Sequence, residues 1–251
     1  MAKCGAIFKK MIDVKYRDKY AQIIGISAII LIVLEIILLP IIHVAPWKTA
    51  SLACYAAVIL TAAFGLVSFR GDRKGDLIRV GLLLTLVADY FLVIKYDSDL
   101  EGVVAFVSVQ LCYFAYTLVR EERHKVRKLN VLIRTVLIAV LLSACFIILG
   151  DDVDALSIVS VIYYGNLVAN VFFAFLLGRK ARLFAIGLTL FAMCDLCIGL
   201  DILFNSYLES TVDIFYGDYF NLPWVFYQPS QILIALYLGR QINVRQGGCA
   251  A

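Results

Sequence analysis

The chain has few charged residues and few prolines for its length. Only 17% of its 251 residues are charged and four are proline, whereas 63% are hydrophobic. Soluble globular domains carry more charge and less apolar sequence than this. A soluble domain is therefore excluded, and an integral membrane protein is predicted.

Histidine is also scarce, which limits the chemistry that the chain can support. We expect its two histidines, His43 and His124, on opposite sides of the membrane, whereas zinc takes about four ligands that lie close together. Cys194 and Cys197 form a CxxC pair inside an apolar segment, away from a helix N-terminus that would activate a thiol. We therefore predict no metal, no cofactor and no disulfide framework.

Eight apolar segments have roughly the 17 to 25 residues that a helix needs to cross a bilayer. The sequence therefore predicts an all-α membrane protein with eight transmembrane helices in one domain over residues 20–238. A basic N-terminal segment over 1–19 precedes this domain and a tail over 239–251 follows it. The segments are 20–44, 48–69, 77–94, 100–119, 131–149, 155–177, 183–204 and 222–238.

Basic residues fix the orientation of these segments. All but two of the 23 Lys and Arg residues fall on the same side as the N-terminus, and the exceptions are Lys48 and Lys95. Because cytoplasmic loops carry an excess of Lys and Arg, both termini are predicted to be cytoplasmic, in a multi-pass protein of the bacterial inner membrane. We take the net charge of +4 as an orientation signal towards anionic membrane lipids. No nucleic acid is expected as a partner, and a homo-oligomer is left open.

Two stretches share one pattern, a glycine followed eight residues later by an aspartate. They are GLLLTLVADYFLVI over 81–94 and GLTLFAMCDLCIGL over 187–200. At 1.5 Å per residue, Asp89 and Asp195 both lie about 18 Å from the inner start of their segments. The pattern predicts two parallel four-helix repeats, about 20–119 and 131–238, related by an axis along the membrane normal. The two acids would then face each other across a central cavity that opens outwards.

Acidic residues at this depth are candidate functional groups. An ionised carboxylate in hydrocarbon is costly, so such an acid usually faces the interior of the bundle. Amide side chains enter the membrane to a similar depth from the outer side, at Gln110, Asn166 and Gln231. The alternative for each acid is a structural hydrogen bond between helices. Glu35, in the first segment, is interpreted as a residue that pairs inside the bundle.

These motifs resemble the YhhN-like integral membrane proteins, a family that includes the lysoplasmalogenases. The first family signature is similar to Gly81, Leu82, Thr85, Ala88, Asp89 and Leu92, and it continues with Gly102, Phe106, Gln110 and Tyr113. The second signature resembles Gly187, Phe191, Cys194 and Asp195, and the closing aromatic and glutamine resemble Tyr227 and Gln231. Lys48 falls where the family has Lys-Pro. This chain departs from the family at Ala88 in place of Gly, Gln110 in place of His and Cys194 in place of Ser.

The resemblance implies hydrolysis of the vinyl ether bond of a lysophospholipid substrate. Vinyl ether hydrolysis suits two carboxylates, because one can donate a proton while the other guides water, as in glycosidases. Asp89 and Asp195 are the candidate catalytic residues, one protonated and one ionised. The candidate substrate-binding residues are Lys48, Gln110, Tyr113, Asn166, Tyr227 and Gln231. The alternatives are a small-solute transporter or channel with a central acidic site, and a lipid-binding family member without catalytic activity.

Overall fold

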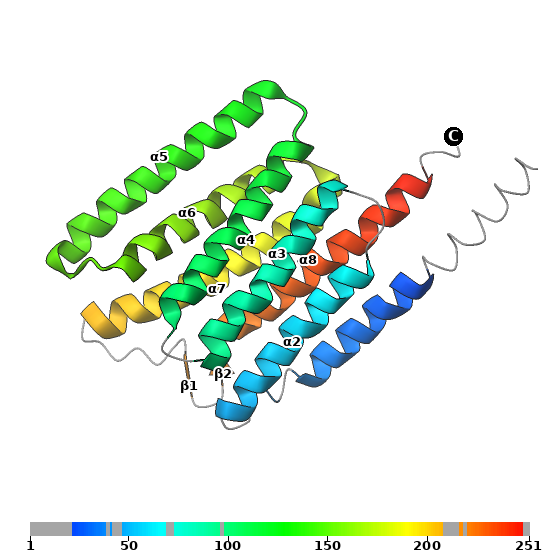
Figure 1. Cartoon of the computed structure of the whole chain (residues 1–251), viewed down its shortest axis with the longest axis horizontal. Helices are drawn as coiled ribbons and strands as arrows, with labels where there is room; N and C mark the ends of the chain where they lie inside the picture. The colour runs from blue at the N-terminus through cyan, green and yellow to red at the C-terminus, as the bar shows by residue number, and fades with distance from the viewer. Residues whose placement is uncertain are drawn as a thin grey trace, which may run out of the picture.

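Apolar helices make up nearly all of the chain that the computed structural model describes, which comprises residues 22–38, 41, 47–68, 73–95, 98–207, 216–217 and 220–247. A first helix over Gln22–Leu38 precedes the labelled elements (Figure 1). The long helices are α2 (Trp47–Val67), α3 (Arg73–Asp89), α4 (Asp99–Arg120), α5 (His124–Leu149), α6 (Ala155–Leu176), α7 (Arg182–Tyr207) and α8 (Leu222–Gly247). A short antiparallel strand pair, β1 (Tyr216–Gly217) and β2 (Phe220–Asn221), leads into α8.

Six helices in the described part of the chain are long and apolar enough to cross a membrane: α2, α3 with its continuation, α4, α5, α6 and α7. The prediction of an all-helical, multi-pass membrane protein is therefore confirmed. The total of eight spans and the cytoplasmic position of both termini stay predictions. The basic segment over 1–19 lies outside the described residues.

Two helix boundaries differ from those predicted. α3 ends at Asp89, and the segment continues as a π-helix over Tyr90–Lys95, where the sequence predicts one regular helix over 77–94. α5 begins at His124, seven residues before the predicted span. Arg134, one of the basic residues assigned to the side of the N-terminus, therefore lies about 15 Å into α5.

The helices pack in a closed order around a common core. α2, α3, α4, α6, α7 and α8 are neighbours in that sequence, and α8 returns to α2. If α2, α3 and α4 are exchanged for α6, α7 and α8, the order of neighbours around the ring stays the same. The packing fits two parallel repeats, which stay a prediction.

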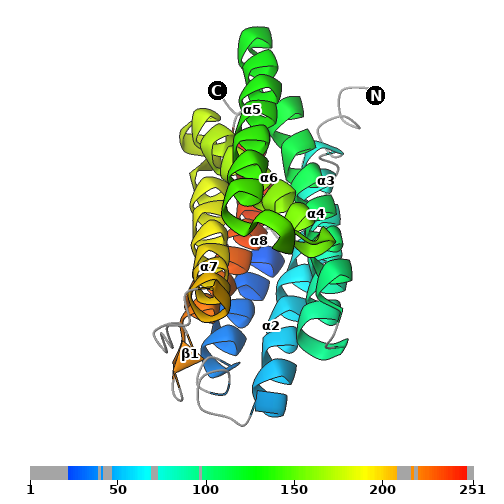
Figure 2. The ribbon, with the colours of Figure 1, turned by 90° about the vertical axis from the view of Figure 1, so that its left-hand side faces the viewer.

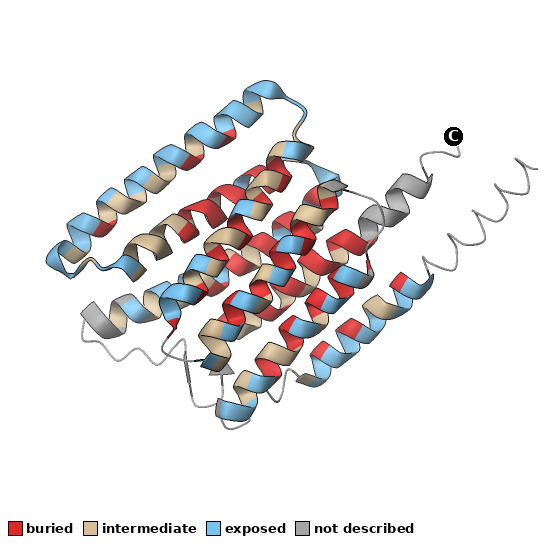
Figure 3. Cartoon of the chain, viewed as in Figure 1, coloured by how far each residue is buried: buried red, intermediate tan, exposed pale blue. Residues whose placement is uncertain are grey.

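α5 lies outside this ring and packs mainly on α6. Only 11% of its apolar window is buried, against 39% to 44% for the other five candidate spans. Seen from the side, α5 lies in front of the other helices (Figure 2), and most of its surface is exposed (Figure 3). Its apolar side chains are therefore available to lipid.

Two loop carboxylates hold helix ends. The Asp154 Oδ1 atom accepts hydrogen bonds from the Ser157 backbone N–H at 2.7 Å and from its hydroxyl at 2.6 Å, which caps α6 and lowers the pKa of Asp154. Between α4 and α5, Arg123 donates to both carboxylate oxygens of Glu121, at 2.8 and 2.7 Å. These bonds lower the pKa of Glu121. Both carboxylates are therefore ionised at neutral pH.

The glycines that begin the two repeated stretches allow close helix packing. A Cβ atom at Gly81, in α3, would lie 2.5 Å from the Tyr113 ring of α4. A Cβ atom at Gly187, in α7, would lie 2.8 Å from Ile234 Cγ1 and 3.0 Å from the Ser230 carbonyl oxygen of α8. Gly81 of α3 thus faces α4, and Gly187 of α7 faces α8.

We expect Gly187→Ala to lower stability, because the added methyl group meets the backbone of α8 and overpacking costs about 1 to 3 kcal/mol. The matched control is Gly199→Ala in the same helix, where a Cβ atom meets nothing within 4 Å. Thermal unfolding of the detergent-purified protein measures both. An unchanged midpoint for Gly187→Ala would show that α7 and α8 do not pack this closely.

Candidate active site

Each of the two predicted acids is held by a tyrosine from another helix. Asp89, the last residue of α3, is only 3% exposed, and its Oδ2 atom accepts a 2.5 Å hydrogen bond from the hydroxyl of Tyr227 in α8. Asp195, in α7, is partly buried, and its Oδ2 atom accepts a 2.5 Å hydrogen bond from the hydroxyl of Tyr163 in α6. Four helices therefore contribute to this pair of sites.

The two acid sites are neighbours in the bundle. The ring of Phe191 packs against both Tyr227 and Tyr163, the tyrosines that hold Asp89 and Asp195. The structure therefore places the two predicted partners beside one aromatic cluster, and their joint role in catalysis stays a prediction.

Aromatic rings surround the acid pair. Phe191 lies with its ring centre 5.3 Å from that of Tyr227 and 6.4 Å from that of Tyr163. Phe106 lies 5.5 Å from Phe191 and 5.6 Å from Tyr163. These contacts place a cluster of aromatic rings beside the tyrosines that hold the carboxylates. Aromatic rings attract a cation at their faces, so such a cluster suits positive charge that develops on a bound molecule.

A second buried polar cluster lies on α4, α5 and α6, centred on Arg134, which is 6% exposed. Its Nη1 atom donates to Asn166 Oδ1 at 2.6 Å, and its Nη2 atom donates to Asn170 Oδ1 at 2.8 Å and to Asn130 Oδ1 at 3.3 Å. The guanidinium carbon lies 4.0 Å from the centre of the Phe114 ring. Amide oxygens and an aromatic ring thus surround this charge in place of water.

Two predicted substrate-binding residues, Gln110 and Asn166, belong to this second cluster. Asn170 Nδ2 donates to the Gln110 side-chain oxygen at 3.0 Å and to its backbone oxygen at 2.9 Å. Asn166 accepts from Arg134 and donates from Nδ2 to the Ile162 carbonyl at 2.8 Å. In the structure described here, both amides therefore hold helices together.

The other predicted substrate-binding residues divide between the acid site and more distant positions. Tyr227 bonds to Asp89, and Gln231, one turn further along α8, is 1% exposed. Tyr113 packs edge-on against Phe184, with ring centres 5.4 Å apart, and forms part of the core. Lys48 is exposed near the start of α2. The structure does not place Tyr113 or Lys48 beside the acids.

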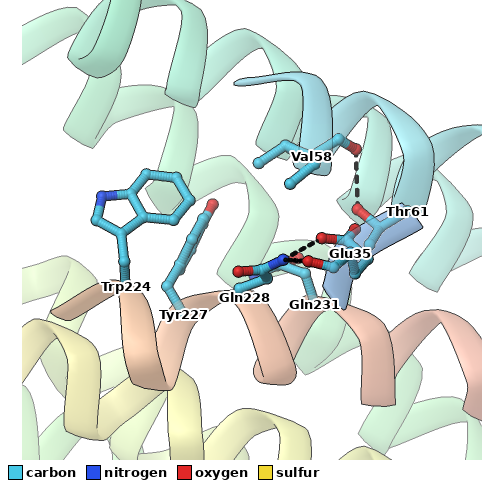
Figure 4. A pocket seen from close by; sticks show the side chains of 8 residues that line it. Glu35, Val58, Thr61, Trp224, Tyr227, Gln228 and Gln231 are labelled. Carbon is cyan, nitrogen blue, oxygen red and sulfur yellow. Dashed lines mark hydrogen bonds between the residues drawn. The ribbon is translucent and has the colours of Figure 1, made fainter. Parts of the chain in front are cut away.

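A small pocket adjoins the acid site where the first helix meets α2 and α8 (Figure 4). It is a narrow, partly open cleft of about 160 Å³ when the open space at its mouth is counted, and its walls include Glu35, Trp224, Tyr227, Gln228 and Gln231. The amide nitrogen of Gln228 donates to the Glu35 carboxylate and to the Glu35 backbone oxygen. Tyr227 links this pocket to Asp89 through its hydroxyl.

Sequence reasoning missed the Arg134 cluster. The positive-inside rule explains an arginine near the inner end of a span without further assumptions, so Arg134 was counted only as one of the basic residues on the side of the N-terminus. The asparagines Asn130, Asn166 and Asn170 were the available signal, because amides in apolar helices need partners. Glu35 was expected to pair inside the bundle, and it does pair with Gln228.

The fold and the site define a multi-pass helical membrane protein with two carboxylates inside its bundle, each bonded to a tyrosine. Over residues 44–237, the sequence matches the model of the YhhN family. The chain belongs to this family. No curated protein and no solved structure matches it significantly.

We expect Arg134→Met to destabilise the protein by about 3 kcal/mol, because it leaves the oxygens of Asn130, Asn166 and Asn170 without their donor. The matched control is Arg179→Met, since Arg179 is exposed. Chemical unfolding gives the difference in free energy, and hydrogen exchange should show the loss of protection in α5. Equal stability of the two variants would contradict a structural role for the cluster.

Proposed function

We propose that this protein hydrolyses the vinyl ether bond of lysoplasmalogen-type lysophospholipids, the activity known for the YhhN family. One observation carries the proposal. Two carboxylates inside an apolar bundle each accept a hydrogen bond from a tyrosine, and the two tyrosines pack against the same Phe191 ring. A lipid substrate reaches such a site from the membrane.

The reaction needs a proton donor and a proton acceptor in turn. A protonated carboxyl group gives its proton to the vinyl carbon that does not carry oxygen, which leaves an oxocarbenium cation. Water then adds to the carbon bonded to oxygen and loses a proton to the ionised carboxylate. The resulting hemiacetal breaks into a fatty aldehyde and the glycerol hydroxyl of the headgroup fragment. Asp89 and Asp195 take these two roles, as general acid and general base.

The surrounding groups suit the charges that develop. The rings of Phe106, Phe191 and Tyr227 cluster beside the acids, and aromatic rings stabilise a cation that lies over their faces, as the oxocarbenium cation would. The hydroxyls of Tyr163 and Tyr227 hold the carboxylates in position and favour their ionised forms when the proton has left. Gln110 takes no proton, because an amide does not titrate, and its oxygen is already engaged by Asn170.

A solute carrier is the second candidate function, favoured by the order of the helices around the core. Transporters built from parallel repeats also place their sites between the repeats, near the middle of the membrane. The two functions differ in their readout, since an enzyme releases aldehyde from lysoplasmalogen, whereas a carrier moves solute across proteoliposomes. Flux without any release of aldehyde would replace the enzymatic proposal with this one.

Asp89→Asn and Asp195→Asn should each lower the rate of aldehyde release by a factor of about 10² to 10⁴, the usual contribution of a general acid or base. The matched control is Asp99→Asn, an exposed carboxylate at the start of α4. An enzyme-coupled aldehyde assay on purified, folded variants measures the three rates.

Incorporation of deuterium from the solvent tests whether the vinyl carbon is protonated. Aldehyde formed in D₂O and reduced immediately should carry one deuterium on the carbon next to the former carbonyl. Full turnover by both Asp→Asn variants would overturn the roles assigned to the acids, whereas absence of that deuterium would overturn protonation at carbon.

Tyr163→Phe and Tyr227→Phe should each lower turnover by about ten- to a hundredfold, because a hydrogen bond to a charged group is worth about 1.5 to 3 kcal/mol. Tyr90→Phe serves as the control, since Tyr90 follows Asp89 in sequence but is exposed. Comparing turnover with substrate affinity separates positioning of the carboxylates from substrate binding. Rates that match the control would show that the two hydroxyls play no part in the reaction.

A further inference from the structure

The pocket between the first helix, α2 and α8 contains buried polar atoms that have no partner. Glu35, Gln228 and Gln231 are 2%, 4% and 1% exposed. In each of them one side-chain oxygen, Oε1, makes no hydrogen bond within the described structure. A buried acceptor without a donor is costly. Three such acceptors around one pocket point to a ligand that brings hydrogen-bond donors.

The remaining walls of the pocket suit a donor that carries positive charge. Trp224 and Tyr227 lie edge to face, with ring centres 5.0 Å apart, and both line the pocket. Aromatic faces attract ammonium groups, and Glu35 supplies a carboxylate. Figure 4 shows Gln228 between these rings and Glu35, with its amide nitrogen turned towards Glu35. A carboxylate, two amide oxygens and two rings together form a site with the chemistry of an ammonium receptor.

We propose that this pocket binds a primary ammonium group. An ammonium with N–H bonds can donate hydrogen bonds to unpaired oxygens of this pocket, whereas a quaternary ammonium has no donor to offer them. The pocket is narrow, so the incoming ammonium takes the place of the Gln228 amide at the Glu35 carboxylate. Gln228 thus acts as an internal donor that satisfies Glu35 while the pocket holds no ligand.

The position of the pocket connects it to the acid site. Tyr227 lines the pocket with its ring and bonds to Asp89 with its hydroxyl. Resting on the proposed function, the inference is that the pocket takes the ammonium of an ethanolamine headgroup and holds the substrate beside Asp89. Glu35 precedes the region that matches the family model, which begins at residue 44. Glu35 would therefore add headgroup selectivity to the acid site from outside the matched region.

Binding of unreactive lipids tests the inference apart from catalysis. The probes are saturated ether lysolipids with an ethanolamine, a choline or a glycerol headgroup, none of which contains a vinyl ether bond. Wild-type protein in detergent should bind the ethanolamine lipid about tenfold more tightly than the other two, as measured by quenching of Trp fluorescence or by microscale thermophoresis. Free ethanolamine serves as a separate probe, and its displacement of the lipid would show that the site recognises the amine itself.

Glu35→Gln is the test variant, because it keeps the shape of the side chain and removes its charge. It should lose the preference for ethanolamine while keeping the affinity for the choline lipid, which also reports that the variant is folded. The control is Glu101→Gln, an exposed carboxylate in α4, which should keep the preference.

The result that overturns the inference is a wild-type protein that binds the three lipids equally, or a Glu35→Gln variant that keeps the full preference. Either result leaves the acid chemistry unaffected. Conversely, headgroup preference in a protein that never releases aldehyde would support the ammonium site and reject the hydrolase.

Discussion

In hydrocarbon, a polar group is stable only when another protein group pairs with it, because no water is present to do so. This requirement explains how the helices of the bundle are connected. Asp89 joins α3 to α8 through Tyr227, and Asp195 joins α7 to α6 through Tyr163. Arg134 joins α5 to α6, and Glu35 joins the first helix to α8. The same bonds therefore hold the fold together and fix the positions of the two acids in the proposed mechanism.

The two halves of the chain pair their aspartates with different residues. α8 carries Tyr227 and, four residues later, Gln231; α4 carries Phe106 and, four residues later, Gln110. Asp89, in the first half, bonds to Tyr227 of α8. The residue of α4 that corresponds to Tyr227 is Phe106, which has no hydroxyl to donate to Asp195. Tyr163 of α6 supplies that hydroxyl instead. The two acids thus sit in different surroundings, which is what a division into proton donor and proton acceptor requires.

Composition and charge predicted the class of fold, because apolar length and the placement of Lys and Arg depend on the membrane rather than on details of packing. The glycine and aspartate spacing also identified Asp89 and Asp195 as a pair, since depth follows directly from helical rise. Depth does not give direction around a helix, however. Gln110 and Asn166 turn towards Asn170 and Arg134, and this depends on how α4, α5 and α6 pack.

Two other features depended on contacts far apart in sequence. Gln228 meets Glu35 across 193 residues, and a periodicity pattern contains no information about such a partner. The position of α5 outside the ring could not be predicted from the sequence either, because an apolar helix that faces lipid and one that faces protein have similar compositions.

The π-helix over Tyr90–Lys95 has a consequence for comparing the halves. A π-helical turn accommodates more residues than an α-helical turn, so side chains beyond Asp89 point in other directions than their counterparts beyond Asp195, where α7 stays regular to Tyr207. Superposition of the duplicated segments should therefore hold from each glycine to its aspartate and then fail. Any symmetry between the two halves therefore ends at the acid, and the two segments differ in geometry beyond it.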